Sequence, residues 1–286
     1  MTPSVVLQYL LPHRLLTTLV HWATRWGWKP WKNFLIDQII TRFNVDLSEA
    51  QITDRDEFEH FNAFFTRALK DGARDVNAAP EAIICPADGR ISQAGAIEAG
   101  RIFQAKGQSY TATELLGDAL GAEPYANGSF ATVYLSPRDY HRVHMPLSGR
   151  LRETVHVPGR LYSVAPFAVQ DIPRLFARNE RLVCHFDGEH GPFAVVMVGA
   201  MLVASVTTVW SGLEIPPFGK RIVRRDWRDR NINLARGDEM ARFNMGSTAI
   251  VLVPGSASLV ALEAEQPMKL GDVIGSWRPS TVSATA

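Results

Sequence analysis

The chain of 286 residues is long enough for one large domain or two small ones, and its 46% hydrophobic and 21% charged residues exclude a wholly disordered protein. Thirty basic residues against 29 acidic ones give a formal charge of +1, a balance that argues against a dedicated nucleic-acid-binding protein. The two cysteines, Cys85 and Cys184, have apolar neighbours and are too few for a disulfide framework. We therefore expect two buried thiols in a reducing compartment.

Residues 1–36 are expected to form amphipathic helices on a membrane surface. They contain no acidic residue, but four basic ones and four of the seven tryptophans. Pro12 separates a short apolar piece, Val5 to Leu11, from a longer helix with apolar side chains at helical spacing. A basic face opposite Trp and Leu is typical of interfacial helices. The apolar face contains Leu15, Leu16, Leu19, Val20, Trp22, Ala23 and Trp26, opposite Arg14, Thr18, His21 and Arg25.

The alternative for this N-terminal helix is packing against the core of the protein itself. The absence of acids and the density of tryptophan favour the membrane. The sequence contains no run of about 18 apolar residues that could span a bilayer. It also lacks the charged segment that precedes the apolar stretch of a secretory signal. A peripheral anchor is therefore the expectation.

Residues 37–78 are expected to be a helical region, continuing a pattern that starts near Asn33. Ser48 and Gln51 have the spacing of a capping box between two helices. The first apolar face contains Phe34, Leu35, Ile36, Ile39, Ile40 and Phe43, and the second contains Phe58, Phe61, Phe64, Phe65, Ala68 and Leu69.

Residues 79–286 are expected to form a β-rich catalytic domain, because short apolar, β-branched stretches alternate there with Gly and Pro turns. One short helix is expected over Thr111 to Leu120. The fold class is therefore α+β, with membrane-facing helices on a mainly antiparallel, barrel-like β body. The expected strands are Ile83–Ile84, Arg101–Gln104, Phe130–Leu135, Leu151–Val157, Leu182–Phe186, Phe193–Val209 and Thr248–Val253.

Three separated polar clusters are candidates for the chemistry. The first is Asp88-Gly89 in Pro86–Arg90, a pair that is also common in β-turns. The second, from Ser136 to Pro146, places His141 and His144 three residues apart in a polar loop. A metal site would need a third ligand, for which Asp139 or His156 would have to be guessed, and no metal-binding motif is present. Catalysis is the better interpretation of the two histidines.

The third cluster spans Gly237 to Thr248 and ends in Gly246-Ser247-Thr248. Gly-Ser-Thr alone is a weak signal, because many turns contain it. Here it directly precedes the apolar run Ala249–Val253, which places Ser247 at a junction between a loop and a strand. A glycine before the serine permits backbone conformations that a Cβ would resist.

These clusters together resemble the phosphatidylserine decarboxylase family, in order from about Leu7 to Trp277. The resemblance rests on the Asp-Glu-Met-x-Arg-Phe-x-x-Gly-Ser-Thr string ending at Thr248, on Arg138–Pro146 and on Pro86–Gly89. Supporting strings are Phe64–Arg67, Gln104–Gly107 and Leu175–Arg181. Met245 stands where many bacterial members have Leu, and Ala241 replaces a frequent Gly. Both changes are conservative in size and remove no reactive group.

The resemblance implies a proenzyme that cuts itself between Gly246 and Ser247, giving a β chain of residues 1–246 and an α chain of residues 247–286. Ser247 would attack the carbonyl of Gly246, and an N→O acyl shift and β-elimination would leave a dehydroalanine that loses ammonia to become a pyruvoyl group. Asp88, His144 and Ser247 would be the maturation triad, in which the histidine takes the serine proton and the aspartate orients the histidine.

The covalent pyruvoyl cofactor would then form a Schiff base with phosphatidylserine and accept the electrons released as CO₂ leaves, so that phosphatidylethanolamine is produced. His141 is the candidate for proton transfer during decarboxylation. The implied partners are phosphatidylserine and the anionic surface of the cell membrane, on its cytoplasmic face. A β/α heterodimer, and a dimer of these, are family expectations, and no nucleic-acid partner is expected.

Two rival functions remain at this point. A serine hydrolase would use Ser247, His144 and Asp88 on an external ester, but the sequence lacks its Gly-x-Ser-x-Gly elbow. A non-catalytic lipid-binding protein would need only the N-terminal anchor and a basic stretch, which is otherwise a solvated face. That stretch contains Lys220, Arg221, Arg224, Arg225, Arg228 and Arg230, interrupted by Asp226 and Asp229.

Overall fold

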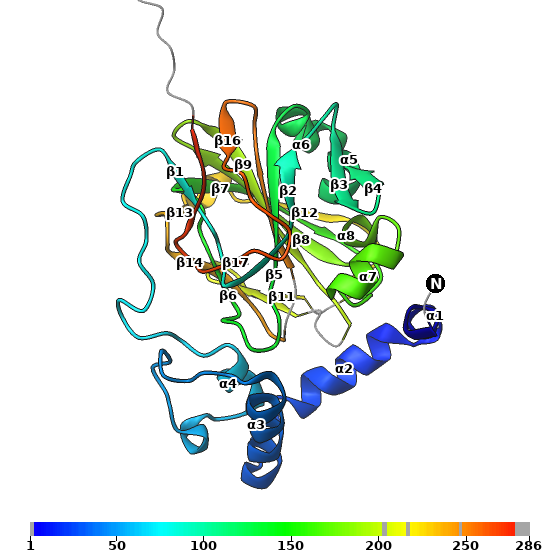
Figure 1. The fold of residues 1–286 in the computed structure, drawn as a ribbon, viewed down its shortest axis with the longest axis vertical. Coiled ribbons are helices and arrows are strands. Elements are labelled where there is room, and N and C mark those ends of the chain that lie inside the picture. The colour runs from blue at the N-terminus through cyan, green and yellow to red at the C-terminus, as the bar shows by residue number, and fades with distance from the viewer. Residues whose placement is uncertain (1–2, 202–204, 216–217, 246–247, 278–286) are drawn as a thin grey trace, which may run out of the picture.

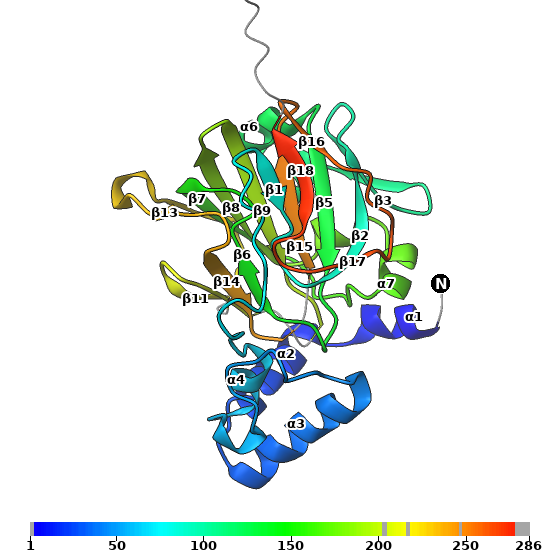
Figure 2. The ribbon, with the colours of Figure 1, turned by 60° about the vertical axis from the view of Figure 1, so that its left-hand side comes forward.

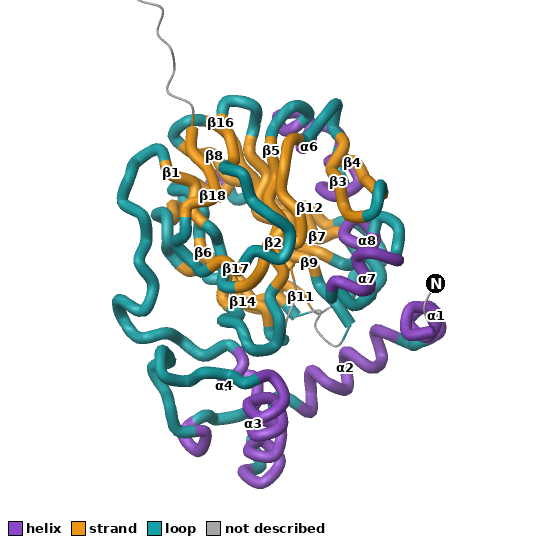
Figure 3. The backbone as a smooth tube through the Cα atoms, viewed as in Figure 1, coloured by secondary structure: helices purple, strands orange, loops and turns teal. Residues whose placement is uncertain are grey.

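A computed structural model describes residues 3–201, 205–215, 218–245 and 248–277 (Figure 1). Strands form a large β body, and the first four helices lie along and below one end of it (Figures 1 and 3). The strand pairings between named elements are antiparallel. The expected α+β class is therefore confirmed.

The N-terminal helices are α1 (Pro3–Leu10), α2 (His13–Ala23) and α3 (Lys29–Phe43). The break between α1 and α2 lies at the expected proline, because Pro12 cannot donate a backbone hydrogen bond. α1 and α2 run beneath the β body, whereas α3 projects away from it (Figure 2).

The apolar side chains of α2 do not point toward the protein core. His13 and Thr17 are its buried residues, whereas Leu15, Leu19 and Trp22 are 59%, 57% and 66% exposed. Helices that pack on a protein core bury their apolar face. α2 therefore contacts the body through the side of His13 and Thr17, whereas both the apolar side chains Leu15, Leu19 and Trp22 and the polar side chains Arg14 and Thr18 are exposed.

The expectation of a helical region over residues 37–78 is largely wrong. α3 continues to Phe43, and after it the structure places only the 3₁₀ turn η1 (Arg55–Glu57) and the short α4 (Phe61–Phe65) there. Ser48 does not cap a helix, because the carboxylate of Asp46 accepts hydrogen bonds from its backbone N–H and its hydroxyl in a local turn. The aromatic residues nevertheless form a small core with α3, which contains Ile36, Phe58, Phe61, Phe64 and Phe65.

The β body is built on one large sheet. In spatial order its strands are β12 (Val223–Asp226), β7 (Gly149–Val157), β8 (Arg181–Gly188), β9 (Gly191–Val198), β15 (Thr248–Val253), β5 (Ser129–Tyr134), β2 (Gly89–Ala96) and β17 (Pro267–Met268), with β13 (Asn233–Leu234) beside β7. Among the residues that the structure describes, this path does not close on itself, so the barrel-like body is an open sheet.

Three smaller sheets and several short helices complete the body. The sheets are β11 (Gly212–Ile215), β10 (Val206–Thr208), β14 (Glu239–Phe243) and β6 (Arg142–His144); β1 (Ala82–Ile84), β18 (Val273–Trp277) and β16 (Ala257–Leu259); and β3 (Arg101–Ala105) with β4 (Gln108–Thr111). The helices and 3₁₀ turns are α5 (Ala112–Leu116), α6 (Ala119–Ala122), η2 (Glu123–Tyr125), α7 (Pro166–Asp171), α8 (Leu175–Arg178) and η3 (Arg228–Arg230). The single helix expected over 111–120 is two helices, because Gly117 adopts a left-handed conformation with φ 69° and ends the first.

The central strands of the large sheet are buried on both faces. In β8, Leu182 and Cys184 belong to one apolar core and Val183 to the other. In β15, Val251 and Ile250 divide in the same way. Successive side chains of a strand point to opposite faces, so a strand between two cores is apolar throughout. This explains the continuous apolar runs of the sequence, and Cys85 and Cys184 are buried and free as expected.

Candidate active site

The first and third polar clusters meet at one end of the inner strands of the large sheet. β2 and β15 both pair with β5, and Arg90 and Thr248 both lie opposite Tyr134. Because strands in a sheet are spaced about 4.8 Å apart, the first residues of β2 and β15 are about 10 Å apart. Asp88 directly precedes β2. Gly246 and Ser247 lie outside the described residues, but Thr248, which follows them, is at this end.

The turn at Asp88 requires a glycine after it. A Cβ on Gly89 would lie 2.2 Å from the carbonyl oxygen of Tyr134. No side chain fits at that distance, so the close approach of β2 to β5 depends on the glycine.

The second cluster joins the other two through backbone hydrogen bonds. The N–H of His144, in β6, donates to the carbonyl of Pro86 at 2.8 Å. β6 also pairs with β14, with His144 opposite Glu239, and β14 leads directly toward residues 246–247. The three clusters that are far apart in the sequence therefore converge.

The ring of His144 is held in one tautomer. Its Nδ1 lies 2.7 Å from the carbonyl oxygen of Gly237, which can only accept, so Nδ1 carries the proton. Its Nε2 lies 3.0 Å from the hydroxyl of Tyr140, which therefore donates to it. Burial lowers the pKa of His144, mainly by removing water from the charged form. His144 is thus a neutral imidazole with its lone pair on Nε2, the form that a general base needs.

His141 is fully buried beneath α4. Its ring centroid lies 4.1 Å from that of Phe65, and its Nδ1 donates to the carbonyl of Asp139 at 2.8 Å. Nε2 has no hydrogen-bond partner within the described part of the chain. Burial, followed by the nearby charge of Arg67, lowers the pKa of His141 to about 3. This imidazole is neutral and carries a free lone pair.

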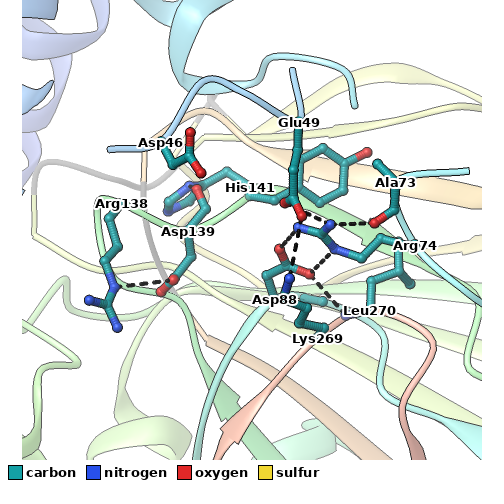
Figure 4. A network of polar contacts seen from close by, with 12 residues as sticks. Asp46, Glu49, Ala73, Arg74, Asp88, Arg138, Asp139, His141, Lys269 and Leu270 are labelled. Carbon is teal, nitrogen blue, oxygen red and sulfur yellow. Dashed lines mark hydrogen bonds and ion pairs between the residues drawn. The ribbon is translucent and has the colours of Figure 1, made fainter. Parts of the chain in front are cut away.

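Asp88 is paired with Arg74 (Figure 4). Nε of Arg74 donates to Oδ1 of Asp88 at 2.9 Å and Nη2 pairs with Oδ2, while the N–H of Leu270 donates to Oδ1 at 2.9 Å. Arg74 also binds Glu49 at 2.8 Å. The hydrogen bond that a triad would place between Asp88 and His144 is not formed, since Gly237 occupies Nδ1. Against the effect of burial, the hydrogen bond to Gly237, then the charge of Glu239 and, least, the charge of Asp88 raise the pKa of His144.

Several residues at this site carried no signal in the sequence. Arg74 lies in a loop of ordinary turn composition. Asn244 donates to Ser205 and Thr207, both at 2.9 Å, and accepts from Asn62 at 3.0 Å. Asn62 also donates its backbone N–H to Thr24, at the end of α2. This chain of hydrogen bonds links the N-terminal helices to the segment that leads to Ser247. Only the three-dimensional structure brings these residues together.

A cavity of about 590 Å³ adjoins the site. It is lined by residues around α4 and by residues in or next to β6 and β14, among them Arg67, Arg142, Arg242 and Asn244. Arg67 is only 6% exposed, and its Nε and Nη1 have no hydrogen-bond partner among the described residues. Burial lowers the pKa of Arg67, but arginine stays charged in proteins. A buried cation with free N–H groups is suited to an anionic ligand.

The described residues do not bring three metal-ligating side chains together at any point. The site offers two neutral imidazoles, a carboxylate fixed by Arg74, and a cavity in which Arg67 is buried and free to bind an anion, although Glu57 and Glu59 also line it. This arrangement suits proton transfer on a substrate with a negative charge.

The comparisons with known proteins agree with this arrangement. The family model described as phosphatidylserine decarboxylase matches residues 61–276, and one described as PSD matches residues 3–44. The phosphatidylserine decarboxylase proenzyme of Xanthomonas campestris pv. campestris (strain B100) is 62% identical over 270 residues, covering 94% of this chain and 96% of the relative. That of Stenotrophomonas maltophilia (strain R551-3) is 58% identical over 280 residues, covering 97% and 100%. The chain belongs to the phosphatidylserine decarboxylase family.

Proposed function

We propose that this chain decarboxylates phosphatidylserine to phosphatidylethanolamine and CO₂, after cutting itself between Gly246 and Ser247. The observation that supports the proposal best is the convergence of Asp88, His141 and His144 near the end of the central strands where β15 begins, one residue after Ser247. Asp88 directly precedes β2, the backbone N–H of His144 donates to the carbonyl of Pro86, and the backbone carbonyl of His141 accepts from the backbone N–H of Phe243 at the end of β14. No single segment of the chain contains this set.

In this proposal His144 is the base of the self-cleavage. Its Nε2 takes the hydroxyl proton of Ser247, whose oxygen then attacks the carbonyl carbon of Gly246. Tyr140 donates to the same nitrogen and has to release it for this step, so Tyr140 keeps the ring oriented until then. Asp88, fixed by Arg74, stabilises the imidazolium that forms through its negative charge rather than through a direct hydrogen bond.

The residues present fit a pyruvoyl group at position 247. When formed, its ketone would accept the amine of the substrate and take up the electron pair released with CO₂. His141 has a free Nε2 lone pair in a water-poor environment beside Phe65, and in this proposal it relays a proton, which Nε2 first accepts, to the carbon that CO₂ leaves. Arg67 would bind the phosphate of the headgroup in the adjoining cavity.

Replacing Ser247 with alanine tests the proposal. Intact mass measurement should show one full-length chain for Ser247→Ala and two pieces for the parent, the smaller one with a carbonyl at its N-terminus. Ser256→Ala, at an exposed serine in the same C-terminal segment, is the matched control and should be cut normally. Cleaved protein from Ser247→Ala would refute the assignment. An intact parent chain that hydrolyses esters would favour a serine hydrolase instead.

We also propose that the protein is a peripheral protein of the cytoplasmic face of the cell membrane. The described helices include none that is both long and apolar enough to cross a bilayer. The support is the exposed apolar surface of α1, α2 and the turn that follows, which includes Leu7, Leu10, Leu15, Leu19, Trp22 and Trp26, between 45% and 77% exposed. A lipid headgroup held at this surface would be close to the site.

The purely lipid-binding alternative is less well supported, because much of its basic stretch is already paired. Arg224 binds Asp118 and Glu153, Arg225 binds Glu214, and Arg228 binds Asp226. The strand β12 in this stretch is an exposed edge of the large sheet, where charged residues prevent pairing with another chain.

A further inference from the structure

A second cavity, of about 740 Å³, lies at the other end of α2, between its first turn and the β body. Four cationic side chains line it: Arg14, Arg160, Arg178 and Lys220. No aspartate or glutamate is among the described residues that line it, and the first turn of α2 contains no acidic residue. The positive end of the α2 dipole adds to the same potential.

Two of these cations are held in place by the fold. The guanidinium of Arg178 lies 5.0 Å from the ring centroid of Tyr162 and 5.6 Å from that of Tyr9, and it donates to both hydroxyls. Arg14 donates to the carbonyl of Gly219 at 3.0 Å. A cation that is already fixed loses less side-chain entropy when it binds an anion.

The nearest buried carboxylate is already partnered. Glu180 is fully buried and accepts from His156 at 2.8 Å, and it lies 3.5 Å from Arg14. It therefore offsets Arg14, while Arg160 and Lys220 remain exposed around the cavity. The cavity retains an excess of positive charge after this pairing.

The cavity is separate from the candidate active site but lies beside the same membrane-facing surface. Leu11 and Leu15 also line it, and Leu15 is 59% exposed on the outer face of α2. Arg25, which lines the active-site cavity, follows the far end of the helix. At 1.5 Å per residue, the two ends of α2 are roughly 15 Å apart.

We propose that this cavity binds the phosphodiester of an anionic glycerophospholipid, at a site distinct from that of the substrate. Arginine side chains donate two hydrogen bonds at once to a phosphate, and a helix N-terminus supplies further donors. The exposed leucines allow the acyl chains of the same lipid to remain in the bilayer while its phosphate enters the cavity. A lipid bound there fixes the position of α2 against the body.

Short-chain lipids that stay monomeric in solution test the proposal. Titration of the full chain with dihexanoyl-phosphatidylglycerol, followed by calorimetry, should show saturable binding of one lipid per chain. Dihexanoyl-phosphatidylcholine should bind at least tenfold more weakly, because its ammonium meets a positively charged cavity. Inorganic phosphate and glycerol phosphate, which carry the anion without acyl chains, should also bind at least tenfold more weakly.

The variant Arg160→Gln/Lys220→Gln removes two exposed charges from the cavity and should weaken binding of the anionic lipid at least tenfold. Arg150→Gln/Arg230→Gln removes two exposed charges elsewhere on the body and should change it less than twofold. Thermal melting of both variants checks that the fold is intact. Because all four positions are exposed, we expect the melting temperatures to stay close to that of the parent.

Three results would overturn the proposal: no saturable binding, equal weakening in both variants, or inorganic phosphate binding as tightly as the lipid. The last would assign the cavity to a soluble anion. The measurement is made on Ser247→Ala protein as well as on the parent, so it does not depend on self-cleavage. Failure of this inference would thus leave the proposed function untouched.

Discussion

Replacing Arg74 with glutamine would show how much of the candidate site depends on one ion pair. The side chains of Arg74 and Asp88 are only 8% and 11% exposed, so solvent screens the pair weakly. Removing the arginine leaves a buried carboxylate with only the N–H of Leu270 as a strong donor. Breaking a buried pair in this way costs about 3 kcal/mol of unfolding free energy.

Urea denaturation of uncleaved Ser247→Ala protein, with and without Arg74→Gln, measures this loss. The control is Arg152→Gln, because Arg152 and Asp187 form a looser pair at 3.4 Å with the carboxylate 49% exposed. An exposed pair of this kind contributes less than about 1 kcal/mol. Similar losses for the two substitutions would contradict the argument that burial makes the Arg74 pair strong.

The same substitution connects stability to chemistry. If Arg74 fixes Asp88 for maturation, Arg74→Gln should slow self-cleavage under conditions where the protein is still folded, and Asp88→Asn should slow it to a similar extent. The double variant should then be little worse than either single one, because both remove the same interaction. If the two reductions in the rate of self-cleavage multiply in the double variant, Arg74 and Asp88 act separately.

Three further outcomes are expected. Tyr140→Phe removes the donor that favours neutral His144, so the pKa of His144 should rise and the pH profile of self-cleavage, followed by gel, should move to higher pH. Burial lowers the pKa of His185 to about 4, so the unfolded chain takes up a proton first as the pH falls. Stability should therefore be full above about pH 6.5 and decrease toward pH 4, and His185→Gln should reduce that decrease in urea midpoints. Leu15→Ser/Trp22→Ser should lower flotation with anionic vesicles about tenfold or more, since both side chains are exposed on α2.

Controls separate these effects from general ones. Leu120→Ser changes another exposed leucine, on α6, and should leave flotation unchanged. His190→Gln changes an exposed histidine and should not alter the pH dependence of stability. Equal behaviour of a test variant and its control would contradict the corresponding prediction.

Local sequence patterns predicted some elements to within a residue and others not at all. The run Thr248–Val253 is mostly apolar and rich in β-branched residues, and it forms β15 with those bounds. The aromatic spacing of Phe58 to Leu69 predicted a long helix, but the structure has only Phe61–Phe65. These side chains are buried by packing against α3, which a loop can provide as well as a helix.

Local sequence patterns predicted even less about the contacts within the candidate site. Its reactive residue types were visible in short motifs, but their partners were not. Asp88 is bound by Arg74, 14 residues away, and by Leu270, 182 residues away. The carbonyl that sets the tautomer of His144 belongs to Gly237, 93 residues away. A backbone carbonyl carries no identity in the sequence, so only the folded chain reveals which one a ring contacts.

The central position of β15 has a consequence for reversibility. This strand lies between β5 and β9, and β17 and β18, which follow it in the chain, join two different sheets. A cut before Ser247 would leave the C-terminal piece, with β15, β17 and β18, paired with strands of the other piece but no longer covalently joined to it. Refolding of the uncut protein is a first-order process, whereas two separated pieces must first encounter each other. Denaturation that is reversible before maturation would then become dependent on protein concentration, and at high dilution effectively permanent, once the chain is cut.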